Sequence, residues 1–243
     1  MLPKVTTRPA SSVTPSAASW TDLPGFPTAI MDNGVAVNEG KVYSIGGTDG
    51  ASVFASGFAY DPVGGQWNPI AGMSWAREVP EVAAIGGRLY VVGGWGGTGD
   101  PVPSLEIYDP LSNNWSTGAS MPVPLAAGGV AVLNGRMYVV GGCDTKHPRA
   151  PRGVRLRSAV EQLDPVADYP LAISWEACGA LTGQLYCASG TGDALNDTAK
   201  GYAYNPTIDA WSPIIDLPMT MWASGYTAAN GMLLVSGGVS RPG

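Results

Sequence analysis

The sequence predicts an all-β fold, a β-propeller of about five four-stranded sheets, or blades. Three observations support this prediction: a composition rich in turn-forming residues, a glycine doublet that returns at a nearly constant interval, and a hairpin before each doublet. The 243 residues include 34 Gly and 21 Pro, whereas only 13% are charged. Such a composition favours short strands and turns over long exposed helices.

The glycine doublet marks a repeat. Its second residue stands at Gly47, Gly94, Gly142, Gly190 and Gly238. These positions are separated by 47 residues once and by 48 residues three times, and Ser189 replaces the first glycine of the fourth copy. A second marker follows in "FAYDPVGGQW", "EIYDPLSNNW" and "YAYNPTIDAW", which end at Trp67, Trp115 and Trp211. So constant a period indicates a repeated structural unit.

Each copy is predicted to form four antiparallel strands. The first two flank a two-residue turn, as in "GGVAVLNGRMYVVGG", where Asn134 and Gly135 can both adopt the positive φ of a type I′ turn. Equivalent turns are expected at Glu39-Gly40, Gly86-Gly87, Thr182-Gly183 and Asn230-Gly231. A loop then leads to a third strand with "YDP" and a fourth with the tryptophan. Radial stacking covers both apolar faces of such sheets, which favours a propeller.

Two copies depart from the pattern. In the third, Arg157 and Leu163 replace the expected Asp and Trp, so we expect the third and fourth strands of this blade to be weak or absent. Residues 146–163 reflect either a compensated reading-frame disturbance in the gene or a divergent exposed loop. The fifth copy stops at "LLVSGGVSRPG", before its last two strands. We expect a segment around Trp20 to supply the outer strand of this fifth blade. The chain is then expected to be either a fragment of a longer protein or an open ring.

The domain organisation follows from the same repeat. Residues 1–19, rich in Ser, Thr, Pro and Ala, are predicted to be a linker, and residues 20–243 the propeller. The amino terminus lacks the apolar centre of a signal peptide, and no apolar run is long enough to span a bilayer. A net charge of -6 disfavours nucleic acid as a partner. Neither nucleic-acid binding nor membrane insertion is therefore expected.

The pattern "YVVGG … YDP … W" resembles the kelch repeat, and the resemblance covers residues 20–243. The segments "PTAIMDNGVAVNEGKVYSIGGTDG" and "WEACGALTGQLYCASGTGD" are similar to kelch modules of secreted bacterial multidomain proteins, some of which carry a subtilisin-like peptidase domain. This resemblance implies a kelch-type propeller in an extracellular protein. It also implies that a peptidase domain of the same parent protein is a candidate partner.

Two of the three cysteines are placed symmetrically about a predicted turn. Cys178 and Cys187 flank Thr182-Gly183 and should face each other across two strands, within reach of a disulfide. The residues alone leave a bridge and two buried thiols equally open. The resemblance to secreted proteins favours the disulfide and an oxidising compartment. Cys143 is expected to remain unpaired.

The sequence offers little for catalysis. His147 is the single histidine, and no G-x-S-x-G, HExxH or CxxC pattern is present. We therefore predict no catalytic residues, no metal site and no cofactor. The glycine doublets are interpreted as positions of tight packing and turn geometry, because no helix follows them to bind a phosphate.

Surface residues remain as candidates for binding. Connections between blades and loops between second and third strands should form a rim at one end of the propeller. The candidate ligand-binding residues on this rim are Asp32, Trp75, Arg77, Glu78, Trp95, Trp175, Glu176 and Trp222. Exposed aromatic rings beside carboxylates suit stacking on a sugar or anchoring of a peptide. The alternative is that the tryptophans pack between blades.

The sequence thus predicts a non-catalytic binding or interaction module, with a protein or carbohydrate ligand, of a secreted bacterial multidomain protein. Two alternatives stay open. One is an enzyme that performs acid/base chemistry on a sugar with Glu78 or Glu176, as in kelch-type sialic acid mutarotases. The other is a structural appendage of a subtilisin-like peptidase.

Overall fold

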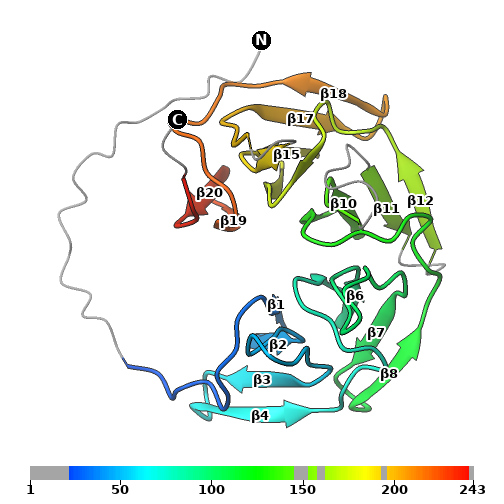
Figure 1. The fold of residues 1–243 in the computed structure, drawn as a ribbon, viewed down its shortest axis with the longest axis vertical. Coiled ribbons are helices and arrows are strands. Elements are labelled where there is room, and N and C mark those ends of the chain that lie inside the picture. Colours follow the sequence, from blue (N-terminus) through cyan, green and yellow to red (C-terminus); the bar gives the residue numbers. More distant parts are fainter. Residues whose placement is uncertain (1–21, 145–152, 158–161, 193–195, 241–243) are drawn as a thin grey trace.

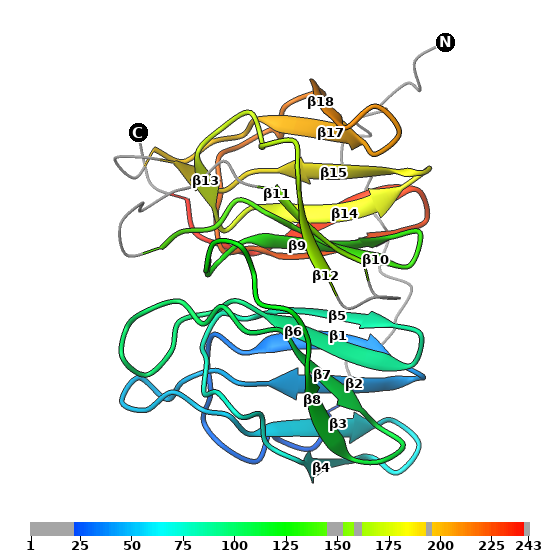
Figure 2. The same ribbon diagram turned by 90° about the vertical axis from the view of Figure 1, so that its right-hand side faces the viewer.

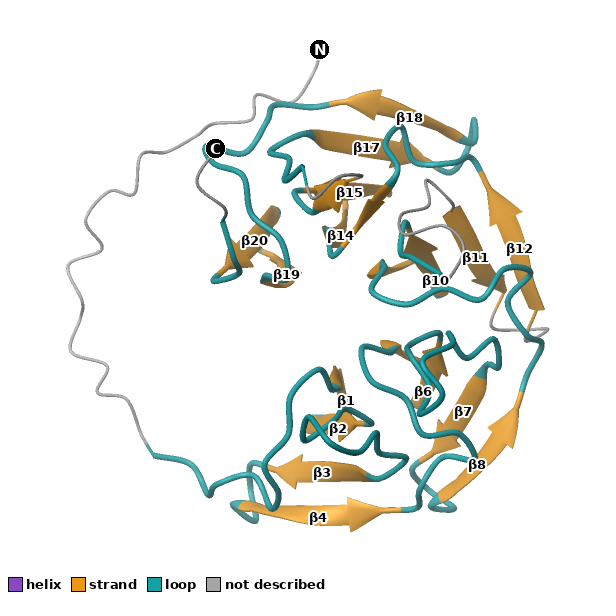
Figure 3. Ribbon diagram, in the orientation of Figure 1, coloured by secondary structure: helices purple, strands orange, loops and turns teal. Residues whose placement is uncertain are grey.

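The computed structural model describes residues 22–144, 153–157, 162–192 and 196–240. Within these ranges the chain forms strands and no helix, and its sheets are arranged around a central axis (Figure 1). The secondary structure in Figure 3 is accordingly all strand and loop. No helix in the described ranges is long and apolar enough to cross a membrane. The predicted all-β propeller is confirmed.

Four blades have four antiparallel strands each. Blade 1 contains β1 (Gly34–Asn38), β2 (Lys41–Ile45), β3 (Gly57–Asp61) and β4 (Gln66–Ile70). Blade 2 contains β5 (Glu81–Ile85), β6 (Arg88–Val92), β7 (Glu106–Asp109) and β8 (Asn114–Thr117). Blade 3 contains β9 (Gly129–Leu133), β10 (Arg136–Val140), β11 (Gly153–Arg157) and β12 (Gln162–Val166). Blade 4 contains β14 (Ala177–Leu181), β15 (Gln184–Ala188), β17 (Gly201–Asn205) and β18 (Ala210–Pro213).

The fifth blade has two strands in the described chain, β19 (Gly225–Ala229) and β20 (Met232–Ser236), as the sequence predicts. Both Met232 and Leu234 of β20 are exposed, in contrast to the buried second strands of the other blades. Trp20, the linker 1–19 and residues 146–152 and 158–161 lie outside the described residues.

The hairpins form as predicted because both turn residues take positive φ. Asn134 has φ 51° and Gly135 has φ 68°, and the other four turns behave in the same way. These angles give the turn the right-handed twist of the flanking strands. Both residues of every doublet also have positive φ, including Ser189 at 66°. A Cβ on Gly94 would lie 2.7 Å from the carbonyl oxygen of Glu78, so this position needs glycine for close packing.

Apolar side chains alternate between the two faces of each blade. In β10, Met137 and Val139 pack against blade 2, whereas Tyr138 and Val140 pack against blade 4. Strands buried on both faces read as continuous apolar runs, which explains "RMYVV". The buried apolar side chains form three clusters, which lie between blades 1 and 2, blades 2 and 3, and blades 3 and 4.

The "YDP … W" marker stabilises the outer part of the blade. Tyr108 and Trp115 are direct cross-strand partners with ring centroids 5.1 Å apart. Trp115 Nε1 donates a hydrogen bond to the carbonyl oxygen of Ala71, the first residue after β4 in the connection from blade 1 to blade 2. Trp211 makes the same bond to Ala167 at 3.0 Å. In blades 2 and 4 the tryptophan therefore ties the outer strand to the connection from the preceding blade.

One expectation is wrong. The third and fourth strands of blade 3 are present: β11 pairs with β10 and β12 pairs with β11. Leu156 and Leu163 are register partners at the positions that Tyr and Trp occupy in blades 1, 2 and 4. The antiparallel ladder uses main-chain groups, so it forms wherever the chain can remain extended, with or without the marker residues.

The predicted disulfide is present. Cys178 and Cys187 are register partners in β14 and β15, with Cα atoms 4.2 Å apart, and their sulfur atoms are bonded. Cys143 is outside this bridge: it is buried, and its thiol donates to the carbonyl oxygen of Ala126 at 3.5 Å.

Candidate functional site: the rim and the axial pocket

The rim is built from main-chain hydrogen bonds between each blade-to-blade connection and the residue after the doublet. Glu78 and Trp95 exchange two such bonds, of 2.9 and 2.8 Å. Equivalent pairs join Met31 to Thr48, Ala126 to Cys143 and Trp222 to Val239. In blade 4 the same contact extends into the short ladder of β13 (Ile173–Ser174) and β16 (Thr191–Gly192). These connections lie at one end of the propeller (Figure 2).

Next to these pairs, each connection turns inward through one residue in the left-handed region. The five residues are Asp32, Val79, Ala127, Trp175 and Ala223, with φ between 51° and 62°. This backbone is costly for a β-branched residue such as Val79. The amide of Val79 donates to the main-chain carbonyl oxygen of Asp32 at 2.6 Å. The amide of Trp175 donates to the main-chain carbonyl oxygen of Ala127 at 2.7 Å. Neighbouring connections are thereby joined around the axis.

A pocket of about 450 Å³ lies inside this ring of connections. The starts of the innermost strands of all five blades line it. The lining includes the residues Asp32, Glu81, Trp175, Glu176 and Tyr226. Its volume lies within the range of small-molecule sites. The pocket is on the propeller axis, where residues far apart in the sequence meet.

Three consecutive amides of blade 3 bind side chains from three other blades in this pocket. Gly128 N donates to Glu81 Oε1 at 2.7 Å, and Gly129 N donates to Glu176 Oε1 at 3.1 Å. Val130 N donates to the hydroxyl oxygen of Tyr226 at 3.0 Å.

Both carboxyl groups are nearly inaccessible to solvent: Glu81 is 3% exposed and Glu176 is 1% exposed. Burial raises the pKa of Glu81 to about 8 and raises that of Glu176 well above its usual value. Burial and the charges of the two glutamates also raise the pKa of Tyr226. Among the described residues, Oε2 of each glutamate has no hydrogen-bond partner. Burial therefore favours the protonated form of both carboxyl groups.

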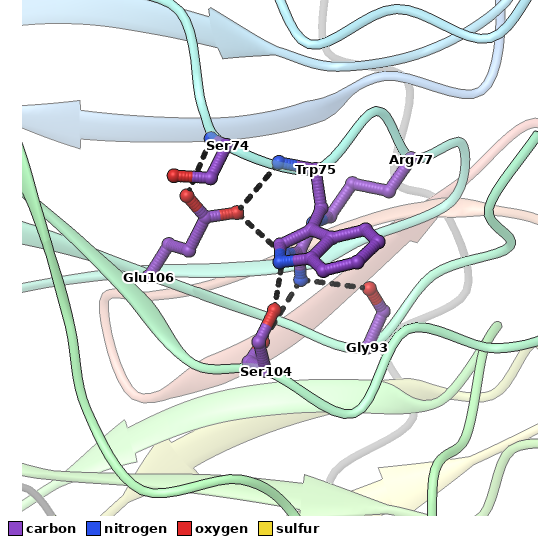
Figure 4. A network of polar contacts seen from close by, with 6 residues as sticks. All are labelled: Ser74, Trp75, Arg77, Gly93, Ser104 and Glu106. Carbon is purple, nitrogen blue, oxygen red and sulfur yellow. Dashed lines mark hydrogen bonds and ion pairs between the residues drawn. The ribbon is translucent and has the colours of Figure 1, made fainter.

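A second buried network supports the rim between blades 1 and 2. The guanidinium of Arg77 donates to the carbonyl oxygens of Gly93 and Ser104 at 3.1 and 3.0 Å and to Ser104 Oγ at 2.9 Å. Its Nη2 lies 2.7 Å from Glu106 Oε1 (Figure 4). Burial lowers the pKa of Arg77, and the adjacent Glu106 opposes this effect. The pair fixes the connection before β5 against blade 2.

Glu106 also positions Trp75. Its Oε2 accepts a hydrogen bond from Ser74 N at 2.6 Å, and its Oε1 accepts one from Trp75 N at 3.2 Å. Trp75, whose indole is drawn in Figure 4, remains 58% exposed as a residue. A buried carboxylate thus fixes the backbone of an exposed aromatic residue.

The structure separates the predicted rim residues into four pairs. Asp32 and Trp75 are exposed, and Glu78 and Trp95 are partly buried in their main-chain pair. Trp175 and Trp222 pack edge to face, with centroids 6.0 Å apart. Arg77 and Glu176 are buried. Arg77 thus lies beneath the rim and Glu176 at the axis; a binding role for these residues stays a prediction.

Sequence reasoning missed Glu81, Glu106 and Tyr226. A signal for Glu81 existed: the same position at the start of the first strand holds Gly34, Gly129 and Gly225 in other copies. An acidic residue where other copies carry glycine indicates a site-specific role. No comparable signal marks Tyr226, because its partner Val130 lies 96 residues away.

Comparisons with known proteins agree with the repeat. A family model described as Kelch motif matches residues 32–74, 80–122 and 124–168, more than half of the chain. Kelch repeat and BTB domain-containing protein 13 of Homo sapiens is 38% identical over 80 residues, which cover 31% of this chain and 18% of that protein. Kelch-like protein 7 of Rattus norvegicus is 30% identical over 85 residues, which cover 35% and 14%.

The chain therefore matches less than a fifth of the length of these relatives. The solved structure of YjhT is similar with a TM-score of 0.80 at 16% identity, over 90% of this chain and 80% of that one. At such identity the similarity concerns the fold alone. Given the matched motifs, the period and the blades, the chain belongs to the kelch-repeat family and folds as a kelch-type β-propeller.

Proposed function

We propose that this propeller is a non-catalytic binding or interaction module whose protein or carbohydrate ligand docks on the rim, with Trp75 as a principal contact. The observation that carries the proposal is the exposed indole of Trp75, whose backbone is fixed by buried Glu106. A preorganised aromatic ring loses little conformational freedom when it binds, so more of its contact energy appears as affinity.

The wider context forms part of the same proposal. The disulfide between Cys178 and Cys187 supports an oxidising compartment, since such bridges persist outside the cytosol. Together with the resemblance to kelch modules of secreted bacterial multidomain proteins, it favours an extracellular location. A peptidase domain of the same parent protein is then one candidate partner.

The test is ligand screening followed by substitution. The purified chain is applied to a glycan array and to a synthetic peptide library, and each hit is titrated. We expect Trp75→Ala to weaken binding by at least about 10-fold, the loss of about 1.4 kcal/mol. Leu111→Ala serves as the control, because Leu111 is 93% exposed in the outer turn of blade 2. Equal affinities of wild type and Trp75→Ala for every hit would contradict the proposal.

The acid/base alternative has an observation of its own. Glu81 and Glu176 line the axial pocket, burial raises the pKa of both, and a carboxyl group with a raised pKa suits proton transfer. Under this alternative the chain accelerates interconversion of the anomers of sialic acid, followed by NMR. Glu176→Gln or Glu78→Gln should abolish the acceleration. Rates equal to the uncatalysed ones would exclude it for this sugar.

The third candidate is a structural appendage. It predicts no hit in either screen and a measurable affinity for a separately expressed peptidase domain of the parent protein. Binding of that domain by Trp75→Ala as strongly as by wild type would place the contact away from the rim.

A further inference from the structure

We propose that the axial pocket binds a positively charged group, an amine or a guanidinium, between the carboxyl groups of Glu81 and Glu176. The inference rests on the proposed binding function, because the charged group would belong to the ligand that docks on the rim. It adds the chemical class of that ligand.

The first argument is that the two carboxyl groups are only half satisfied. Each accepts one main-chain hydrogen bond through Oε1, from Gly128 or from Gly129. The Oε2 atoms are buried and lack a hydrogen-bond partner among the described residues, although both glutamates line the pocket. A buried polar atom without a partner costs free energy, which a donor inside the pocket would remove.

The second argument is that the nearby fixed cation is engaged elsewhere. Arg77 is close enough to Glu81 for an electrostatic interaction, but its Nη atoms bind Gly93, Ser104 and Glu106. The other titratable groups near the two carboxyls are Tyr226, buried Tyr169, which interacts with Glu176, and, at the pocket lining, Asp32. None of the described lining residues is Lys, Arg or His. The lining of the pocket therefore contains acidic groups and no basic residue.

The third argument is the character of the walls. Trp175 is among the lining residues, and aromatic rings attract cations. The whole chain carries a net charge of -6, which favours the approach of cations over anions. A lysine or arginine side chain of a partner presents the required charge at the end of an apolar stem, which can reach into a pocket on the axis.

Binding is coupled to protons. Burial favours the protonated form of both carboxyl groups, whereas a cation that enters the pocket favours the ionised form. Each O–H that ionises releases its proton to solvent, and the resulting carboxylate pairs with the ammonium or guanidinium. Affinity for a permanently charged ligand should therefore rise with pH across the titration of Glu81.

The experiment uses the full chain with three probes of similar length. Cadaverine supplies two ammonium groups, agmatine supplies a guanidinium and an ammonium, and 1,5-pentanediol is the neutral control. Isothermal titration calorimetry at pH 6 and pH 9, in two buffers of different ionisation enthalpy, measures affinity and proton release. We expect one cation per chain, affinity at least about 10-fold higher at pH 9, and no binding of the diol.

Matched substitutions locate the site. Glu81→Gln and Glu176→Gln keep the shape and remove the charge, and each should weaken cation binding at pH 9 by at least about 10-fold. Glu39→Gln is the control, because Glu39 is exposed in the β1–β2 turn. Circular dichroism melts verify that each variant is folded. If the glutamine variants do not fold, proton release by the wild type still decides the matter.

Absence of saturable cation binding, or affinity unchanged in both glutamine variants, would overturn the inference. A rim ligand that depends on Trp75 but lacks a cationic group would overturn it too, while leaving the binding module intact. If instead a cation binds in the pocket and no rim ligand depends on Trp75, the proposed docking surface is wrong and the axial site stands.

Discussion

Arg77 and Glu106 form an ion pair of 2.7 Å in which both side chains are buried. Arg77 comes from the connection between blades 1 and 2, and Glu106 from β7. Beyond the pair itself, Arg77 donates to Ser104 and Glu106 accepts from Ser74. A buried charge is tolerated when it is both paired and hydrogen-bonded, and this pair meets both conditions.

Removing one partner should destabilise the fold strongly. We expect Arg77→Met, or Glu106→Gln, to lower the free energy of unfolding by about 3–5 kcal/mol, because the remaining group stays buried without its partner. Urea unfolding at constant pH measures the effect. Asp216→Asn is the control: its salt bridge to Lys200 is exposed, so the change should stay below about 1 kcal/mol. Equal effects at both pairs would contradict this account.

Stability should fall as the pH rises from about 4.5 to about 8. Burial raises the pKa of Glu81 from its ordinary 4.5 to about 8, so the folded protein holds this proton more tightly than the unfolded chain. The stabilising contribution is complete below pH 4.5 and is lost as the pH passes the folded-state pKa. In Glu81→Gln, the fall in the free energy of unfolding over this pH range should be smaller than in wild type by a few kcal/mol. Chemical unfolding at several pH values measures it; parallel curves for both proteins would refute the assignment.

The disulfide should stabilise blade 4. The two cysteines are nine residues apart in sequence, so the bridge restricts a short loop of the unfolded chain. By loop entropy, its reduction should cost about 2–3 kcal/mol. Unfolding with and without dithiothreitol measures this, and the Cys178→Ala/Cys187→Ala variant, which cannot respond to dithiothreitol, is the control. An unchanged midpoint would show that the bridge contributes little.

Thr182 should be a site of stored backbone strain. It is β-branched and has φ 50° in the β14–β15 turn, where blade 3 has Asn134 at φ 51°. We expect Thr182→Asn to raise the free energy of unfolding by a few tenths to about 1 kcal/mol, because asparagine tolerates the left-handed backbone region better than threonine. The reverse change, Asn134→Thr, should destabilise by a similar amount. Calorimetry measures both effects; a destabilising Thr182→Asn or a stabilising Asn134→Thr would contradict the strain argument.

Features set by local spacing could be predicted from the sequence. The turn at Asn134-Gly135 depends on two adjacent residues, and the pairing of Cys178 with Cys187 depends on counting outward from one turn. The doublets likewise follow from a backbone that only small residues adopt easily. Their prediction needed no knowledge of other blades.

Features set by contacts between blades could not be predicted. The sequence alone suggests that Arg77 is a surface residue, because its partner Glu106 lies 29 residues away in β7. The partner of Glu81, Gly128, likewise lies in another blade. The strands of blade 3 were underestimated for a different reason. Marker residues such as Trp115 stabilise an outer strand but do not create the ladder, which depends on main-chain groups.

The paired bonds between Glu78 and Trp95, and their equivalents in the other copies, involve only peptide groups. Side chains at these positions are therefore free to diverge without loosening the frame that carries them. A new specificity could arise, or be grafted in the laboratory, by exchanging a few such side chains while the scaffold keeps its geometry.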